Sequence, residues 1–361
     1  MATATASTSR HSHIHSPPDY LCVDRFLETA VHCRSLASAF RCGWIDSMLS
    51  APRRLSELAQ GGAFDPTAAE LLVGLLRQGG VVERIELDNA ESEASFRLTD
   101  EFRQALAFRD LLETKMEFAN LLAVDWIDRF DQLLADTSQF MAESRLLQLF
   151  SYQRCFEYSP ENYANTKRWM RLTTALTRYE TPEILDWLSF DSYRDMVDVG
   201  GNSGEFAKQI CRRFARLHAT VFDLPLVCEI GREHLAGSTE SDRIQFYAGN
   251  ALQDALPSAD VYTFKSMLHD WPEAEAMRFL ERAFAELRPG GQLIIFERMA
   301  TDWSKTPWTY GSLPTLLFFR SYRRPAFYLN QLERIGFQDA QCRSIELDMP
   351  FMLIQAKRGS V

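Results

Sequence analysis

The chain has 361 residues, of which 46% are hydrophobic and 12% aromatic, and its formal net charge is −10. This length allows two or three domains with a sizeable buried core. The negative charge argues against a general affinity for nucleic acid or for anionic membranes. No apolar stretch reaches the ~18–20 residues that a membrane-spanning helix needs.

Seven cysteines are scattered along the chain without a CxxC pair, which predicts reduced thiols in a cytoplasmic protein. Residues 1–18 lack the apolar segment of a signal peptide and are expected to form a disordered tail. Their Ser/Thr-rich, acid-free composition leaves a transit peptide open. The alternation of His11, His13 and His15 leaves a metal-binding tract open.

Residues 19–105 are expected to form a small, mostly helical domain. Apolar residues recur at helical spacing over 20–50, and 55–85 predicts a helix, a Gly-containing turn and a second helix. Asp65 and Pro66 are typical of an N-cap followed by the first helical position. "VVERIEL" and "ASFRLTD" follow as two short strands, which together with the helices give the pattern of a winged helix.

A winged helix raises DNA binding as one function. However, its second helix, "DPTAAELLVGLLRQ", carries one arginine against an aspartate and a glutamate. Groove binding needs a cationic face, so protein–protein packing fits this domain better.

Helical periodicity continues through a connecting region, residues 106–187. Over residues 188–361 the pattern of apolar residues changes. "DMVDVGG", "HATVFDLP", "IQFYAGNAL", "DVYTFKSML" and "QLIIFE" are short apolar strands separated by helical segments. This alternation predicts an α/β fold with a doubly wound, Rossmann-like parallel sheet.

The first of these strands runs into a cluster of glycines, Gly200, Gly201 and Gly204. Glycine allows the backbone to approach a ligand closely. The second strand ends in Asp223, about twenty residues on, where an acid can bind the two ribose hydroxyls of an adenosyl group. The spacing is not GxGxxG and no GxxxxGK[ST] is present, so an adenosyl ligand other than a nucleotide triphosphate is indicated.

Strand–GGxxG, strand–Asp, "GN", "LHDW" and helix–"RPGG"–strand follow one another in order. In this order of motifs the chain resembles the S-adenosylmethionine-dependent small-molecule methyltransferases of the caffeic acid/hydroxyindole O-methyltransferase family. The resemblance is strong over residues ~155–360 and looser over ~20–150. It implies a winged-helix dimerisation domain at the N-terminus, a homodimer, and S-adenosylmethionine converted to S-adenosylhomocysteine without a metal.

The resemblance also implies roles for individual residues. The glycines would face the methionine and ribose part of the cofactor, Asp223 would bind the ribose hydroxyls, and Leu224, Asn250 and Ala251 would lie beside the adenine. Lys265 would reach the cofactor. His269 would be the catalytic base and Glu297 an acid that orients it. These expectations concern Gly200, Gly201, Gly204, Asp223, Leu224, Asn250, Ala251, Lys265, His269 and Glu297.

The chemistry of histidine agrees with the role of His269. A phenol with a pKa of ~10 is a poor nucleophile at neutral pH, whereas a histidine with an ordinary pKa of ~6.5 can accept its proton. An adjacent carboxylate fixes the tautomer and stabilises the imidazolium. The alternative is that His269 only starts a helix near "DWPE". No His or Cys lies at ligand spacing from it, so a metal site is not indicated.

Three departures from the family pattern stand out. Asn202 replaces a glycine, which is a mild change because Asn tolerates positive φ. Asn250 replaces an aspartate. No acid occurs between Asp302 and Glu333, where the family has a second acidic partner of the histidine, and Arg320, Arg323 and Arg324 stand there instead.

The arginines have two interpretations: a solvated turn, or a partner for a carboxylate on the acceptor. Aromatic residues in segments that line the family's acceptor pocket favour a small aromatic, phenolic substrate. Open alternatives are methylation of carbon or nitrogen on an aromatic acid or amino acid, a homologue that binds the cofactor without methyl transfer, and a DNA-binding regulator. The candidate substrate residues are Phe156, Met170, Trp271, Phe318 and Arg320.

Overall fold

The computed structural model describes residues 18–60, 65–85, 93–302, 309–318 and 320–360. The predicted tail, with its three histidines, lies outside the described residues except for Pro18. Within the described part of the chain, no helix combines the length and the apolar character that a bilayer crossing requires.

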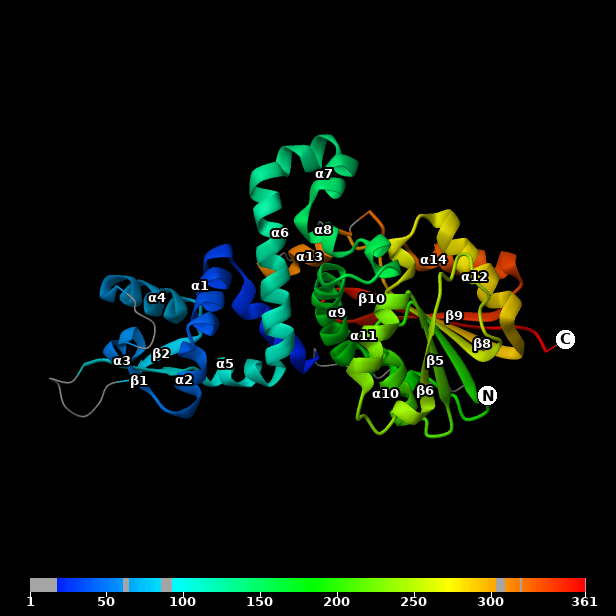
Figure 1. Cartoon of the computed structure of the whole chain (residues 1–361), viewed down its shortest axis with the longest axis horizontal. Coiled ribbons are helices and arrows are strands. Elements are labelled where there is room, and N and C mark those ends of the chain that lie inside the picture. Colours follow the sequence, from blue (N-terminus) through cyan, green and yellow to red (C-terminus); the bar gives the residue numbers. More distant parts are fainter. Residues whose placement is uncertain (1–17, 61–64, 86–92, 303–308, 319, 361) are drawn as a thin grey trace, which may run out of the picture.

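The N-terminal part contains the helices and the hairpin that the sequence predicts. A three-stranded antiparallel sheet of order β1-β3-β2 packs beside its helices (Figure 1). The Asp65 side chain accepts hydrogen bonds from the backbone N–H groups of Thr67 and Ala68, which confirms the predicted N-cap. The elements are η1 (Asp19–Leu27), α1 (Ala30–Arg41), α2 (Trp44–Ser50), β1 (Arg53–Arg54), α3 (Leu55–Gln60), α4 (Pro66–Gln78), β2 (Val82–Ile85), β3 (Ser95–Leu98) and α5 (Asp100–Ala105).

A helical region joins this part to the sheet, as predicted. Its longest member, α6, stands between the N-terminal helices and the C-terminal sheet (Figure 1) and is kinked at Arg129, where φ is −136°. The elements are η2 (Leu106–Phe108), α6 (Arg109–Ala135), α7 (Thr137–Glu143), α8 (Arg145–Leu149), η3 (Tyr152–Phe156), α9 (Pro160–Glu180) and η4 (Thr181–Trp187).

The C-terminal part is an α/β fold around a seven-stranded sheet of order β6-β5-β4-β7-β8-β10-β9. The five strands that the sequence predicts are parallel neighbours. β9 and β10 pair antiparallel at one end and were not predicted. The strands are β4 (Asp195–Val199), β5 (His218–Asp223), β6 (Ile244–Ala248), β7 (Ala259–Lys265), β8 (Leu287–Arg298), β9 (Gln338–Glu346) and β10 (Pro350–Lys357).

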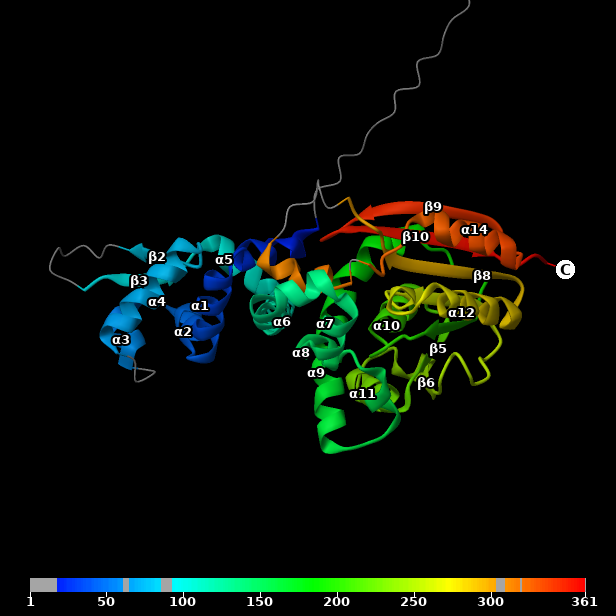
Figure 2. The same cartoon turned by 90° about the horizontal axis from the view of Figure 1, so that it is seen from above.

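Alternate residues of each central strand face two separate cores. On β8, Ile294 and Phe296 pack into one core with α10, whereas Leu293 and Ile295 pack into the other with α12 and α14. Figure 2 shows α12 beside β8 and α14 beside β9. The remaining elements are α10 (Glu205–Arg213), α11 (Pro225–Leu235), η5 (Ser241–Arg243), η6 (Leu268–Asp270), α12 (Glu273–Glu286), η7 (Tyr310–Ser312), α13 (Leu313–Leu316) and α14 (Pro325–Ile335).

The strand order places the functional region. The chain winds outward from β4 through β5 to β6, then returns to the other side of β4 to form β7 and β8. In an open parallel sheet, ligands bind beyond the carboxyl ends of the strands at such a reversal. The glycines after β4 and the histidine after β7 therefore meet at the same edge.

A chain of buried charges joins the helical region to this sheet. The Lys115 amine of α6, with a side chain only 7% exposed, lies 2.9 Å from the Asp24 carboxylate of η1 and 3.5 Å from that of Asp348, beyond β9. Arg298, at the end of β8, lies 4.0 Å from Asp348 and 2.5 Å from Glu180 of α9. Alternating signs compensate the cost of desolvating each charge.

Removal of the central cation tests this network. We expect Lys115→Met to lower the free energy of unfolding by ~3 kcal/mol, because the carboxylates of Asp24 and Asp348 then lose their closest cation in a desolvated place. Urea denaturation followed by circular dichroism measures the change. Lys167→Met is the matched control, since its 56% exposed amine pairs with Glu233 on the surface and such pairs contribute ~1 kcal/mol or less. Equal losses in the two variants would contradict the network.

Candidate active site

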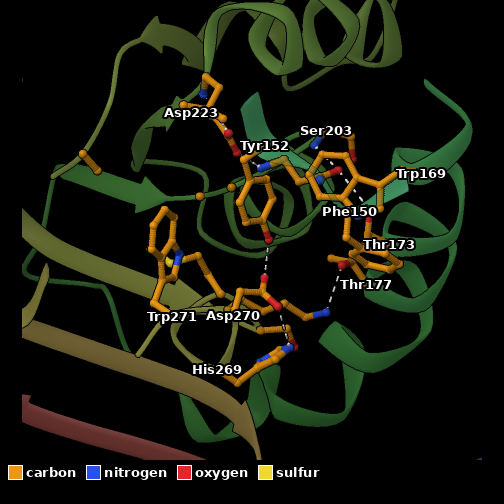
Figure 3. A pocket seen from close by; sticks show the side chains of 18 of the residues that line it. Phe150, Tyr152, Trp169, Thr173, Thr177, Ser203, Asp223, His269, Asp270 and Trp271 are labelled. Atoms are coloured by element: carbon orange, nitrogen blue, oxygen red, sulfur yellow. Dashed lines mark hydrogen bonds and ion pairs between the residues drawn. The ribbon is translucent and has the colours of Figure 1, made fainter. Parts of the chain in front are cut away.

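A cavity of about 380 Å³ lies beyond the carboxyl ends of β4 and β7. Figure 3 shows side chains that line it. Backbone segments that follow the parallel strands form its floor, and aromatic residues of η3, α9 and the region before α14 form its wall. Eleven of the fifteen predicted site residues line it: Gly200, Gly201, Asp223, Leu224, Asn250, Ala251, Lys265, His269, Trp271, Phe156 and Phe318.

The turn after β4 needs backbone conformations that glycine supplies. Gly200 has a φ of +68°, and a Cβ there would lie 2.5 Å from Cγ of Met267. Gly204 has a φ of +76° and begins α10, so it shapes the turn without lining the cavity. Asn202 has a φ of +56°, which confirms that asparagine takes the left-handed conformation expected of it here.

Asp223 anchors this turn from the end of β5. Its Oδ2 accepts the N–H of Asn202 at 2.8 Å, and its Oδ1 accepts the N–H of Leu224 at 2.7 Å. A carboxylate has about four acceptor positions, so capacity remains for a ligand's hydroxyl groups. Desolvation raises the pKa of Asp223 to about 6.

Asp198, inside β4, is an acid that sequence reasoning missed. It is fully buried, its Oδ1 accepts the Thr263 hydroxyl at 2.7 Å, and no described residue donates to its Oδ2. Desolvation raises its pKa to about 7. A Cβ on Gly201 would lie 2.5 Å from this unpartnered oxygen, so glycine at 201 leaves room for the carboxyl group beneath the turn. An aspartate within an otherwise apolar strand was the available signal.

Asn250 and Ala251 follow β6 at the rim. The Asn250 side chain accepts the backbone N–H of Leu252 at 3.0 Å, and the backbone N–H of Asn250 donates to the Asp254 carboxylate at 2.7 Å. The asparagine therefore stabilises a tight turn and presents Ala251 to the cavity.

Lys265 ends β7 with its side chain only 8% exposed. Its amine donates to the Glu180 carboxylate and, at 2.9 Å, to the Thr177 hydroxyl. Burial lowers its pKa and outweighs the opposing effect of Glu180. Burial raises the pKa of the Glu180 carboxyl, but the charges of Arg298 and Lys265 outweigh this effect and lower that pKa to about 2. Lys265 thus lines the cavity as one member of an ion cluster.

His269 and Glu297 meet at the ends of neighbouring strands. Nδ1 of His269 lies 2.6 Å from Oε2 of Glu297, and Oε1 accepts the backbone N–H groups of Met267 and Leu268, each at 2.7 Å. Because Glu297 is fully buried and acts as the acceptor in these contacts, Nδ1 carries the proton and Nε2 keeps its lone pair. Ser266, with a φ of +50°, turns the chain from β7 into this segment.

Asp270 stands at the other ring nitrogen. Its Oδ1 lies 3.4 Å from Nε2 of His269, and its Oδ2 accepts the Tyr152 hydroxyl at 2.5 Å (Figure 3). Burial lowers the pKa of His269, but the carboxylates of Glu297 and Asp270 outweigh it and raise that pKa above the ordinary value. Burial also raises the pKa of Asp270.

Aromatic rings surround this group. Trp271 stacks on Tyr152 with ring centroids 5.8 Å apart, and the rings of Phe318 and Tyr322 lie 5.7 Å and 5.2 Å from that of His269. Phe150, Tyr152, Thr173 and Tyr322 also line the cavity and were absent from the predicted site. Trp169 is one of the aromatic residues in segments expected to line the acceptor pocket, and it lines the cavity too. The four residues absent from the prediction lie just after α8, on η3, on α9 and in the segment before α14, far from the glycine and histidine motifs in sequence.

Two predicted substrate residues lie elsewhere. Met170 is 2% exposed and packs in the core beneath α9, and Arg320 is exposed and does not line the cavity. Arg323 donates to the carbonyl oxygens of Leu268 and Trp271 at 3.0 and 2.5 Å. It therefore fixes the backbone around the histidine, so neither Arg320 nor Arg323 faces the acceptor side of the cavity.

A family model described as an O-methyltransferase domain matches residues 131–338, more than half of the chain. The chain belongs to this family. The match confirms the resemblance that the order of motifs indicated.

Relatives in the O-methyltransferase family agree with this assignment. Acetylserotonin O-methyltransferase of Bos taurus is 33% identical over 174 residues, 46% of this chain and 49% of that protein. The matched segment thus spans about half the length of the bovine enzyme. The tetracenomycin polyketide synthesis 8-O-methyl transferase TcmO of Streptomyces glaucescens is 25% identical over 342 residues, 93% of this chain and 95% of that protein.

Solved structures of O-methyltransferases share the fold. Human N-acetylserotonin methyltransferase in complex with SAM has a TM-score of 0.72 at 20% identity, over 91% of this chain and 94% of that one. The mitomycin 7-O-methyltransferase MmcR has a TM-score of 0.69 at 20% identity, over the same shares. Among the described residues, no group of three or more His, Cys, Asp or Glu side chains is arranged to hold a metal ion.

Proposed function

We propose that this protein transfers a methyl group from S-adenosylmethionine to a hydroxyl group of a small, planar aromatic metabolite, with His269 as the general base. One observation carries the proposal: Glu297 fixes Nδ1 of His269 at 2.6 Å, so the lone pair of Nε2 is directed into a cavity floored by the glycine turn. A family of O-methyltransferases supplies the reaction class.

The residues of the floor fit an adenosyl ligand. A Cβ would fill the turn at Gly200 and Gly201, while Asp223 retains acceptor capacity for ribose hydroxyls. Leu224, Asn250 and Ala251 would border the adenine, and Gly204 would shape the turn. The human relative is described in complex with SAM and another neighbour, PigF, with SAH.

The bound sulfonium would supply an electrophilic methyl group, and the protein would position and deprotonate the acceptor. Transfer requires the acceptor oxygen ~3 Å from the methyl carbon and in line with the departing sulfur. Nε2 of His269 would take the phenolic proton, and Glu297 would stabilise the resulting imidazolium. Lys265, held by Glu180 and Thr177, would border the cofactor through its stem and neutralise that side of the cavity.

The aromatic wall favours a flat acceptor. Trp271, Phe318 and Phe156 would bind its ring by stacking and edge contacts. Acetylserotonin and the tetracenomycin polyketide, named in the descriptions of relatives, are both aromatic, which supports this class and a place in secondary metabolism.

Labelled methyl transfer tests the proposal. We expect label from isotopically marked S-adenosylmethionine on a phenolic oxygen, located by NMR, in a panel of phenols, phenolic acids and hydroxyindoles. His269→Gln should lower kcat by ~10²–10⁴-fold, the usual contribution of a general base, while cofactor binding is kept. His218→Gln, on an exposed histidine at the start of β5, is the control.

Two other results would contradict parts of this proposal. Label on ring carbon or nitrogen would change the acceptor atom and retain the base. Full turnover of His269→Gln at saturating substrate would remove His269 from that role.

The pKa of Asp223 predicts how cofactor binding depends on pH. Below about 6 this carboxyl is protonated and accepts ribose hydroxyls less well, so the dissociation constant for S-adenosylmethionine should rise as the pH falls from 7 to 5. Isothermal calorimetry measures it. Asp223→Asn should bind ~10-fold or more weakly, as expected for a lost charged hydrogen-bond acceptor, and lose this dependence. His269→Gln should keep it, which separates Asp223 from repulsion by a protonated histidine.

We propose, further, that residues 19–105 form a winged-helix dimerisation domain, 106–187 a helical connecting region and 188–361 the catalytic domain of a homodimer. Large exposed apolar side chains on α4 and α6 support an interface: Leu71, Ile127 and Leu134 are 65%, 77% and 71% exposed.

The assembly state tests this proposal. Sedimentation should show a dimer of about 83 kDa, twice the 41.4 kDa chain, that Leu71→Glu on α4 together with Ile127→Glu on α6 weakens. A monomer at micromolar concentration would refute it.

A further inference from the structure

Tyr152 occupies the middle of the cavity, although in sequence it lies outside every motif that predicted the site (Figure 3). Its ring stacks on Trp271 at 5.8 Å with planes 14° apart, and it meets the edge of Trp169 at 5.7 Å. These two contacts fix the direction of its hydroxyl group, which donates to Oδ2 of Asp270 at 2.5 Å.

Asp270 links this hydroxyl to the base. Its second oxygen, Oδ1, lies 3.4 Å from Nε2 of His269, and its side chain is 15% exposed. This distance is long for a hydrogen bond, so the Nε2 lone pair stays available while a negative charge stands beside it. His269 thus has a carboxylate near each ring nitrogen: Glu297 at Nδ1 and Asp270 at Nε2.

We propose that Tyr152 is a positioning residue that acts through Asp270, holding this carboxylate ionised and oriented beside Nε2 of His269. The effect of Tyr152 on turnover rests on the proposed methyl transfer, whereas its effect on the pKa of His269 does not. The segment 303–332 contains no acidic residue. Asp270, held from the helical region by Tyr152, therefore serves as the second carboxylate of the base.

The surrounding charges explain why a donor is needed. Burial and the nearby Glu297 carboxylate raise the pKa of Asp270, whereas His269, the Tyr152 hydroxyl and Arg298 lower it. The guanidinium of Arg298 is engaged with Glu180 and, at 3.4 Å, with Ser266, so it gives Asp270 no direct hydrogen bond.

His269 itself is faced by the charged groups of Glu297, Asp270 and Arg298, and by the uncharged rings of Tyr322 and Phe318. Loss of the Tyr152 hydroxyl leaves the carboxyl of Asp270 to take up a proton more readily. Protonation removes the negative charge of Asp270, one of the two carboxylates that raise the pKa of His269, so this pKa falls. The imidazolium that forms during proton transfer also loses part of its stabilisation.

Tyr152→Phe tests the inference because it keeps the stacked ring and removes only the hydroxyl. We expect the pKa of His269, measured by NMR titration of protein labelled at histidine Cε1, to fall by ~1 unit, as expected for the loss of a close opposite charge. The His269→Gln variant assigns the signal. In the methyl-transfer assay, kcat should fall ~10-fold and the acidic limb of its pH profile should move to lower pH.

Two further variants complete the design. Asp270→Asn should lower the pKa of His269 in the same way, and adding Tyr152→Phe to it should change that pKa little more, because both act through one carboxylate. Tyr158→Phe is the matched control: its side chain is 63% exposed on the same segment, and His269 should titrate as in the wild type. Melting temperature and cofactor affinity report the integrity of each variant.

An unchanged His269 pKa in Tyr152→Phe would overturn the inference, even if KM rose, since Tyr152 would then act only as a wall. The NMR and the assay also separate this inference from the proposed function. A lowered His269 pKa in a protein that labels no acceptor would support the Tyr152–Asp270 coupling and refute the methyl transfer. If the wild type is active and the acidic limb of the pH profile stays in place in Tyr152→Phe, the methyl transfer would be supported and the Tyr152–Asp270 coupling refuted.

Discussion

The Glu297 carboxylate is the contact on which the site depends. It is the penultimate residue of β8, is fully buried, and accepts three hydrogen bonds from one turn: two from backbone N–H groups and one from Nδ1 of His269. Without this acceptor, two buried N–H groups and a histidine would lack a partner, which is costly in a desolvated place. One side chain therefore fixes the backbone after β7, the tautomer of the base and the direction of Nε2.

Charge organises the remainder of the cavity. Cations gather on the side of α9, where Lys265 and Arg298 share Glu180, and carboxyl groups gather near the turn, where desolvation raises the pKa values of Asp198 and Asp223. A cation beside these carboxyl groups favours their ionised form, and aromatic faces also attract cations. The cavity therefore suits a cationic ligand such as a sulfonium. The same buried cations connect through Asp348 to Lys115, so the helical region and the sheet share one electrostatic core.

The parallel sheet and the place of the site could be predicted from sequence, because both depend on patterns among residues close together in the chain. Short apolar strands alternating with helices indicated the parallel sheet. Gly200, Asp223 and His269 stand at the ends of its strands or within four residues of them, and these carboxyl ends must meet. The antiparallel pair β9 and β10 escaped prediction, and the residues between Leu287 and Gln292, taken as the end of a helix and a turn, belong to β8. Strand pairing there is set by neighbours distant in sequence.

The sequence by itself determined the family, through the order of its motifs, and with it the expected pairing of His269 with Glu297. The glycine turn and the acid on β5 could be predicted because they stand at strand ends in a parallel sheet. Only the tertiary structure decided which side chains from outside the sheet reach the base. It places Phe150 and Tyr152 in the cavity and turns Arg320 to solvent, while Arg323 binds backbone carbonyl groups. The physical reason is that helix packing, rather than local spacing, sets which face of η3 and α9 meets the sheet.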